Sequence, residues 1–501
     1  MTQFIPWWVF AWDEISRGSL PLWNDMLGMG APLIANYQSA LFYPVTWLYY
    51  ILYSIGGIGA LAWFQSLVVV FHLAWASLGM ALLIRKFNLS LLAQLIAGLA
   101  FGMSGYLISR AGFLSINATV SWLPWIVLAV THLIEVFVQP EEGNDNLRSS
   151  QQRKKIFAFI SLVLVFALQL LSGHAQSTWY TLIFTIAWTI FFIVFSYQRR
   201  KQRNFLSLDE LAPDSPLEKN ETSSKTTDNR ENPRQGYLEL IAFMTIASAF
   251  VFAVGIAAIQ LLPTGEYLLQ SQRSAAVDYE FAMSYSFWPW RFLSFISPDL
   301  FGNPVTGDYW GYANYWEDAV YIGLIPFILA ISAIFVRKDN STAQTSFRRR
   351  LIWFLLIVIL MTFTIALGQN TPIFPWLYQN IPTFSMFQAP TRISILAVFS
   401  LAILAALGAE TWRRPEGRRL YWLRLGVMAA GAITIGAGIA YFLSQSISMD
   451  IRPSFIRGAA LLGFWGVGFG FLALKAPRKN RTGIDRKDWG WWQWAVIIWV
   501  G

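Results

Sequence analysis

The stretch IGALAWFQSLVVVFHLAWASLGMALLI at residues 58–84 contains no charged residue, and Arg85 and Lys86 follow it directly. At about 1.5 Å per residue, a helix of this length exceeds the roughly 30 Å hydrocarbon layer of a bilayer. The alternating segments of about ten residues that are typical of membrane barrels are absent from the sequence. This stretch therefore predicts a transmembrane helix.

Apolar runs of this kind recur along the chain and predict about twelve membrane spans. We expect them near 58–84, 91–109, 117–138, 155–172, 177–197, 237–263, 319–336, 351–368, 392–409, 424–446 and 456–475, with a twelfth from Trp491. Only 13% of the 501 residues are charged, whereas a soluble chain carries about a quarter of its residues as charge. The predicted fold class is an all-α, polytopic transmembrane helical protein.

The basic residues predict how the spans are oriented. If Arg85 and Lys86 lie inside, all but seven of the 37 Lys and Arg residues fall in cytoplasmic loops. The seven on the outer side are Arg17, Arg110, Arg273, Arg291, Arg392, Arg452 and Arg457. This asymmetry satisfies the positive-inside rule. The net charge of +9 then reflects orientation, and no nucleic-acid partner is expected.

The order of apolar and polar segments predicts four regions. Residues 1–57 form the first extracytoplasmic loop, 58–197 carry spans 1–5, 198–236 form a linker, and 237–501 carry spans 6–12. The linker is polar, charged and poor in aromatic residues, so it is predicted to be disordered in the cytoplasm. Further extracytoplasmic loops are expected at 264–318 and 369–391.

The three predicted extracytoplasmic loops are unusually aromatic, as in SFWPWRFLSFISPDLFG at 286–302. One interpretation is that these rings only anchor the protein in the headgroup layer. The other is that the loops fold into a cavity at the outer membrane surface. The chain has no cysteine, which excludes disulfides, thiol nucleophiles and Cys-ligated zinc. Residues 1–57 are expected to follow an upstream span, so the chain is interpreted as a fragment.

Few ionisable side chains are placed where they could carry chemistry. Glu266 follows the sixth span, and Arg273, seven residues later, would lie on the same helix face if the helix continues that far. His174 stands in the short turn between the fourth and fifth spans, where it could act as a general base or donate a hydrogen bond to a phosphate. Arg392 opens a span and could hold a lipid phosphate, or it could merely reach the headgroups. His72, in mid-span, is interpreted as a packing residue.

The second large loop contains carboxylates that could bind a divalent cation as a cofactor, although their spacing specifies no site. The loop carries Asp278, Glu280, Asp299, Asp308, Glu317 and Asp318. No residue is assigned as a metal ligand.

Four stretches, in this order, resemble the bacterial YfhO family of membrane proteins. They are GSLPLWNDMLGMGAPLIANYQSALFYPVTWLYY at 18–50, SGHAQSTWY at 172–180, IQLLPTGEYLLQSQR at 259–273 and FQAPTRIS at 387–394. That family is similar in architecture to the GT-C glycosyltransferases, which take sugars from a polyprenyl-phosphate carrier. The resemblance thus implies a GT-C-like fold with folded extracytoplasmic loops.

The resemblance also implies roles for individual residues. Glu266 and Arg273 match the family's Glu and Arg after the sixth span, and His174 and Gln176 match its Gly-His-x-Gln turn. Arg392 matches the family's Arg after a proline. Two departures stand out: Gln388 replaces a common Arg, and the family's Asp just before the Gln that matches Gln3 is missing. The second departure would remove the favoured catalytic base and could leave the fragment inactive as an enzyme.

The predicted function is that of a membrane glycosyltransferase-like protein of the plasma (inner) membrane. It would pass a sugar from a polyprenyl-phosphate donor to a cell-surface polymer acceptor on the outer face. Glu266 and His174 are the catalytic candidates, Arg273 and Arg392 would contact phosphate, and Trp23, Asn24, Gln38, Tyr43 and Gln176 would line the substrate. The alternatives are a lipid or polysaccharide flippase and a non-catalytic membrane assembly protein.

Overall fold

The computed structural model describes residues 3–138, 145–209, 237–271, 277–312, 314–334, 343–412 and 452–474. These residues are mostly helical, and the two short strands pair antiparallel, with Trp23 opposite Pro32 and Asn24 opposite Ala31. The first half comprises α1 Phe4–Ser16, β1 Trp23–Asn24, β2 Ala31–Pro32, η1 Tyr37–Ser39, α2 Pro44–Lys86, α3 Leu91–Gly102, α4 Gly105–Ser109, α5 Leu114–Ser121, α6 Leu123–Val138, α7 Asp145–Leu171 and α8 Ala175–Asp209. The second half comprises α9 Leu238–Gln270, α10 Tyr279–Met283, η4 Pro289–Phe295, α11 Leu324–Ala333, α12 Ala343–Ala366, η5 Gly368–Asn370, α13 Ile373–Asn380, η6 Phe384–Met386, η7 Pro390–Ser394, α14 Ile395–Trp412 and α16 Arg452–Leu474.

Eight helical segments among the described residues are long and apolar enough to cross a membrane. They are Pro44–Lys86, Leu91–Ser109, Leu114–Val138, Arg148–Leu171, Ala175–Arg200, Leu238–Gln270, Ser346–Ala366 and Pro390–Glu410. Helices satisfy their own backbone hydrogen bonds, which the hydrocarbon layer requires. The chain is therefore an all-α, multi-pass membrane protein, as the apolar runs predicted.

Not every predicted span has a counterpart among these eight. Among the described residues, the span expected near 319–336 contains only the ten-residue helix α11, because residues 319–323 before it have no regular secondary structure. The expected span near 456–475 coincides with α16. The spans near 424–446 and from Trp491, and most of the predicted linker, lie outside the described residues.

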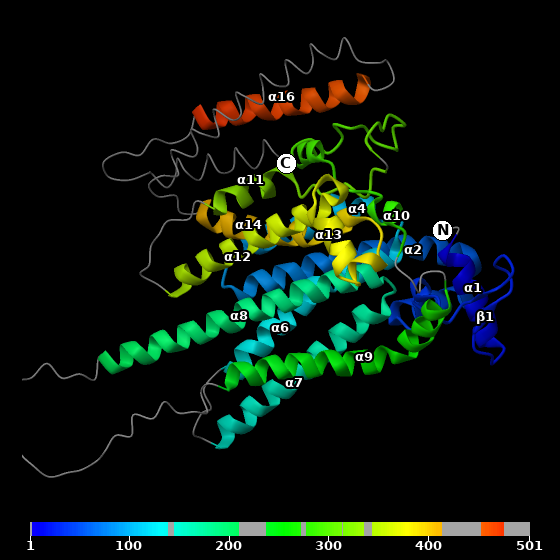
Figure 1. The fold of residues 1–501 in the computed structure, drawn as a ribbon, viewed down its shortest axis with the longest axis horizontal. Coiled ribbons are helices and arrows are strands. Elements are labelled where there is room, and N and C mark those ends of the chain that lie inside the picture. The colour runs from blue at the N-terminus through cyan, green and yellow to red at the C-terminus, as the bar shows by residue number, and fades with distance from the viewer. Residues whose placement is uncertain are drawn as a thin grey trace, which may run out of the picture.

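Helix α14 lies at the centre of the bundle and is almost entirely buried. Its sequence ILAVFSLAILAALGAETW alternates bulky and small apolar residues, so neighbouring helices can approach it closely. Its buried Ser400 donates a hydrogen bond to the carbonyl of Leu396. Helices α3, α11 and α12 pack directly around α14, while α6, α7 and α9 form a neighbouring group (Figure 1).

Helix α2 begins at Pro44, well before the predicted start of its span, and is kinked at Gly57. Gly57 has φ 62° and ψ −157°, a conformation that is essentially confined to glycine. The segment before the kink packs against α1, where Trp8 stacks on Tyr49 at 4.2 Å and Trp12 on Tyr50 at 5.4 Å. Residues 44–56 are therefore helical, although the sequence placed them in the first loop.

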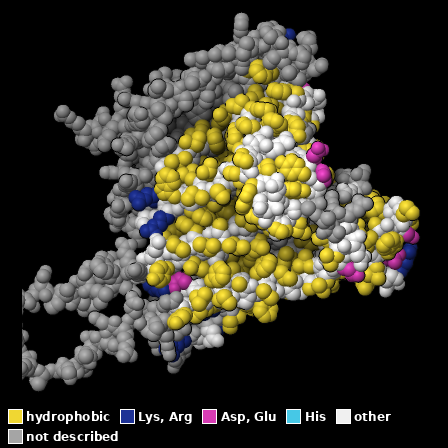
Figure 2. Space-filling view, in the orientation of Figure 1, with side chains coloured by type: hydrophobic (Ala, Val, Ile, Leu, Met, Phe, Trp, Pro, Cys, Tyr) yellow, Lys and Arg dark blue, Asp and Glu magenta, His cyan; other side chains and the backbone are white. Residues whose placement is uncertain are grey.

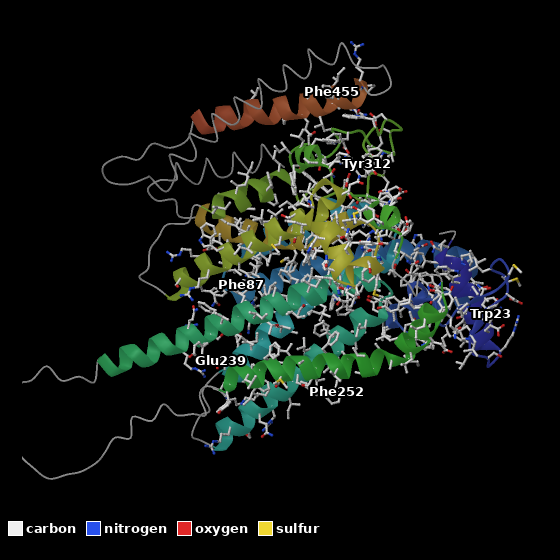
Figure 3. The ribbon with its side chains drawn as sticks, in the orientation of Figure 1. Trp23, Phe87, Glu239, Phe252, Tyr312 and Phe455 are labelled. Atoms are coloured by element: carbon white, nitrogen blue, oxygen red, sulfur yellow. The ribbon has the colours of Figure 1, made fainter. Side chains whose placement is uncertain are left out.

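The shorter elements gather at one end of the bundle, which we call the loop end. It carries α1, the β1–β2 hairpin, α4, α10 and α13 (Figure 1), and η1 is in contact with α1. The opposite end carries ion pairs between Lys86 and Glu135 and between Arg200 and Glu239. Figure 2 shows hydrophobic side chains covering the surface between the two ends, and Figure 3 shows Trp23 and Glu239 far apart along the bundle.

Candidate functional site

The loop end contains a buried cluster of charged side chains centred on Glu317, in the segment that precedes α11. The guanidinium of Arg392 donates from Nε to Glu317 Oε1 at 2.9 Å and from Nη2 to the same oxygen at 2.6 Å. Arg110 donates from Nη2 to Glu317 Oε2 at 3.0 Å. One carboxylate thus accepts hydrogen bonds from two arginines that are 282 residues apart in the sequence. We call Arg110, Glu317 and Arg392 the arginine–glutamate cluster.

Local structure fixes the two arginines of this cluster. Arg110 directly follows α4, where its guanidinium lies 3.8 Å from the ring centre of Tyr106 and donates to the Tyr106 carbonyl at 3.2 Å. Arg392 lies in η7, which starts at Pro390 after Ala389 has turned the backbone with φ 61°. The hydroxyl of Tyr106 donates to the Arg392 carbonyl at 3.1 Å, so both arginines are tied to the same ring.

Helix α8 contributes Gln176 to the edge of this cluster. Its Oε1 accepts from Arg392 Nη1 at 3.1 Å, and its Nε2 donates to the Tyr180 hydroxyl at 3.0 Å and to the Gln388 carbonyl at 2.5 Å. Gln176 therefore connects η7 with the first turn of α8. Gln388 takes part through its backbone carbonyl.

A second buried ion pair adjoins the cluster through the next residue, Asp318. Arg291 of η4 places Nε 3.1 Å from Asp318 Oδ2, and its guanidinium lies 4.5 Å from the ring centre of Phe301. Together the two groups hold three arginines and two carboxylates, so they carry one excess positive charge. Arg392 is the arginine of the three whose side chain is partly exposed, at 21%.

The two neighbouring carboxylates respond oppositely to this environment. Burial alone would raise the pKa of Glu317, but Arg110 and Arg392 outweigh it and hold that pKa below its usual value. For Asp318, burial dominates over Arg291 and raises the pKa to about 6. Glu317 is consequently the carboxylate that stays ionised over the physiological range, as a shared acceptor of two guanidinium groups must.

His174 caps the first turn of α8 beside this cluster. Its Nδ1 accepts from the backbone N–H of Ser177 at 3.1 Å, in the way that an Asn or Asp side chain caps a helix. Because Nδ1 accepts a hydrogen bond, the ring proton is on Nε2, and among the described residues none accepts from Nε2. Burial and, after it, the positive charge of Arg392 lower the pKa of His174 to about 3. The imidazole is therefore a neutral donor.

Tyr43, predicted to line the substrate, belongs to a series of hydrogen bonds that also includes Trp122 and His72. Its oxygen accepts from Trp122 Nε1 at 3.1 Å, and its hydroxyl lies 3.0 Å from His72 Nε2. His72 Nδ1 lies 2.8 Å from the Val68 carbonyl, so it must carry the ring proton, and Nε2 accepts from Tyr43. This arrangement supports the interpretation of His72 as a neutral packing residue.

The structure brings some of the predicted site residues together. Gln176 and Arg392 are in contact, and the charge of Arg392 acts on His174. The turn that carries His174 packs on η1, because Gly173 faces the carbonyls of Tyr37 and Gln38. Gln38 and Tyr43 line a small cavity next to this turn. These five predicted residues therefore form a continuous region.

Three other predicted residues that the structure describes make no hydrogen bond or ion pair with this region. Trp23 is exposed on the hairpin, and Asn24 is buried there, with its side-chain oxygen accepting from the backbone N–H of Met26. Glu266 is exposed near the end of α9, with no hydrogen bond or ion pair to any described residue. Arg273 lies outside the described residues.

Sequence reasoning missed Arg110 and the role of Glu317. Arg110 counted only as one of seven outer basic residues, and Glu317 only as one of six acidic residues in a loop. A signal was present, since a charged residue beside an apolar segment needs a partner. The sequence could not say which partner, because Arg110 and Glu317 are 207 residues apart.

A divalent cation finds no cluster of ligands in the described part of the chain, where no three His, Asp or Glu side chains are grouped to hold a metal. Glu317 and Asp318, which were among the candidates, are each paired with arginine. The arrangement instead suits an anion, through the excess positive charge and the free donor of His174. Comparison of the chain with protein-family models, with curated proteins and with solved structures gives no match.

Proposed function

We propose that this chain is a GT-C-like protein of the plasma membrane that handles a sugar linked to polyprenyl phosphate, with its loop end on the outer face. Two independent considerations support the proposal. The distribution of Lys and Arg residues favours that orientation, and four stretches of the sequence resemble the YfhO family. The acceptor in this proposal is a cell-surface polymer.

The observation that carries the proposal is the partly exposed guanidinium of Arg392 in a region with one excess positive charge. An arginine has five N–H donors, and the hydrogen bonds to Glu317 and Gln176 use one on each of its three nitrogens. Two N–H groups, one on Nη1 and one on Nη2, remain for a further acceptor. A phosphate oxygen is such an acceptor, and the Nε2–H of His174 adds a donor beside it.

In the proposed reaction, a carboxylate removes the proton of an acceptor hydroxyl as its oxygen attacks the anomeric carbon. The bond between that carbon and the phosphate oxygen breaks, and polyprenyl phosphate departs with the electron pair. Arg392, Arg273 and His174 would stabilise the departing phosphate. Glu266, exposed and without a partner among the described residues, is the candidate base.

The flippase alternative requires a continuous polar path through the bundle. Helix α8 has a row of buried threonines along one face, yet Thr181, Thr185 and Thr189 each donate to the carbonyl four residues earlier. Their hydroxyl protons are thus already used within the helix. The assembly-protein alternative assigns the arginine–glutamate cluster a purely structural role, and the following experiment separates it from phosphate binding.

The test is binding of a short-chain polyprenyl phosphate to the purified protein in detergent. Arg392→Ala should weaken binding about tenfold to a hundredfold, since one charge-assisted contact contributes about 1.5–3 kcal/mol. Arg392→Lys should recover part of this loss, because an ammonium group cannot form the paired contact of a guanidinium. Arg273→Ala should weaken binding as well.

His174→Asn is a second test variant, because removing Arg392 also removes contacts within the fold. Asparagine keeps the cap of α8 but lacks the Nε2–H donor, so binding should weaken while the unfolding temperature stays near that of the wild type. Arg17→Ala, an exposed position of the first loop, is the control and should bind normally. If Arg392→Ala and His174→Asn bind as well as Arg17→Ala, the cluster only holds the loops together.

A further inference from the structure

A small cavity lies beneath α1, between η1, α2, α5 and the turn before α8. Its volume is about 30 Å³, enough for one or two water-sized groups. Aromatic rings and short polar side chains line most of it. The lining residues are Phe4, Trp8, Gln38, Ala40, Tyr43, Val45, Thr46, Tyr49, Val68, Val69, His72, Leu114, Ser115, Asn117, Ala118 and Ser172.

Two of these lining residues bury a polar atom that has no partner. The Tyr49 hydroxyl and the Asn117 Oδ1 make no hydrogen bond, although the two residues are only 2% and 1% exposed. Leaving such a group unpaired costs about 1–3 kcal/mol, so an unpaired donor and an unpaired acceptor beside one cavity point to an occupant. An occupant that accepts from Tyr49 and donates to Asn117 would satisfy both atoms.

The charge of the occupant follows from the lining. No Asp, Glu, Lys or Arg lines the cavity, and His72 is neutral, with both of its nitrogens engaged by Val68 and Tyr43. A charged group would be costly in these surroundings. A neutral group that both donates and accepts, namely a hydroxyl, fits them.

The cavity is also joined to the arginine–glutamate cluster. The side-chain Nδ2 of Asn117 donates to the Arg110 carbonyl at 2.9 Å. Asn117 also lines the cavity, so this residue connects the cavity with the cluster. Ser172, two residues before His174, lines the cavity from another side. A ligand with an anionic part and a hydroxylated part could therefore place each part in a matching environment.

We infer that this cavity binds a neutral hydroxyl-bearing group, and that in the proposed ligand this group is one hydroxyl or hydroxymethyl of the sugar. The inference rests on the proposed function, because it assumes that the phosphate of the same ligand reaches Arg392. The volume admits a single substituent of a sugar ring and not the whole ring. The cavity would thus select among sugars by one substituent.

The test uses two neighbouring tyrosines of α2 that differ in one respect. Tyr49 and Tyr50 are both buried with unpaired hydroxyls, but only Tyr49 lines the cavity. Binding is measured for a short-chain polyprenyl phosphate and for the same carrier bearing one hexose. Tyr49→Phe should weaken binding of the hexose-bearing carrier about threefold to tenfold and leave the sugar-free carrier unchanged. Tyr50→Phe should change neither.

The possible outcomes separate the inference from the proposed function. If Tyr49→Phe binds the hexose-bearing carrier as well as Tyr50→Phe does, the cavity holds water only and the inference is overturned, while the phosphate site stands. If the wild type binds neither carrier, the proposed function fails and the inference falls with it. A selective loss in Tyr49→Phe supports both.

Discussion

Glu317 pairs with two guanidinium groups at once, and its side chain is 3% exposed. Burying these charges is costly, and the cost is offset only while every member of the network is present. Arg110 is the most dependent member, because it is fully buried and Glu317 is its carboxylate partner. Removing the carboxylate would leave Arg110 charged in an apolar environment.

We therefore predict that Glu317→Gln destabilises the protein strongly. The amide keeps the size of the side chain but removes the negative charge that offsets the two arginines, and breaking a buried pair from one side costs about 3–5 kcal/mol. The measurement is thermal or denaturant unfolding in detergent, followed by tryptophan fluorescence. Glu14→Gln removes the carboxylate of a more exposed pair with Arg17 and should cost less than about 1 kcal/mol.

The pH dependence gives this prediction a second readout. The pKa of Glu317 is lowered by folding, so its contribution to stability is present above the unfolded value and is lost as the pH falls below about 4.5. That acid loss should be smaller in Glu317→Gln. For Asp318, whose pKa is raised to about 6, the stabilising contribution is lost as the pH rises through 6. Equal acid sensitivity of wild type and Glu317→Gln would contradict the assignment.

At the scale of elements, α2 shows how one residue can redirect a helix. Gly57 adopts a backbone conformation that side chains disfavour, yet an added Cβ would meet no atom within 4 Å. The kink lets residues 44–56 turn their aromatic rings toward α1, while the remainder of α2 crosses the bundle. Gly57 therefore sets the angle between the loop end and the membrane-spanning part.

Gly57→Ala should destabilise the protein by about 1–3 kcal/mol through backbone strain alone. Gly59→Ala is a matched control, because its Cβ also meets open space but its φ is ordinary. That variant should be neutral or stabilising by up to about 1 kcal/mol, since alanine favours a helix. Unfolding midpoints of the two variants decide the question, and equal midpoints would show that the kink does not depend on glycine.

At the scale of the whole molecule, the absence of cysteine permits a direct test of orientation. Val305→Cys places a thiol on an exposed loop of the loop end, and Ser223→Cys places one in the predicted linker. An impermeant maleimide added to intact cells should label Val305→Cys and leave Ser223→Cys unlabelled. Both should react after permeabilisation, and labelling of Ser223→Cys alone in intact cells would reverse the predicted orientation.

The sequence by itself determined that this protein crosses a membrane many times as helices. That prediction depends on local composition, because a run of some twenty apolar residues needs no knowledge of its neighbours to favour the hydrocarbon layer. For the same reason, most spans were predicted close to their observed places. His174 and Arg392 could also be selected from the sequence, as ionisable residues next to apolar runs, whereas Gln176 was selected through the family resemblance alone.

Only the tertiary structure decided what these residues contact. Arg392, interpreted from the sequence as a ligand of a lipid phosphate or a headgroup anchor, shares Glu317 with Arg110, and Tyr43 is held by His72 and Trp122. Helix α11 begins only at Leu324, and the turn before it holds Glu317 and Asp318, each paired with arginine. Such pairings join positions up to hundreds of residues apart, and they depend on how the helices pack, which local composition does not encode.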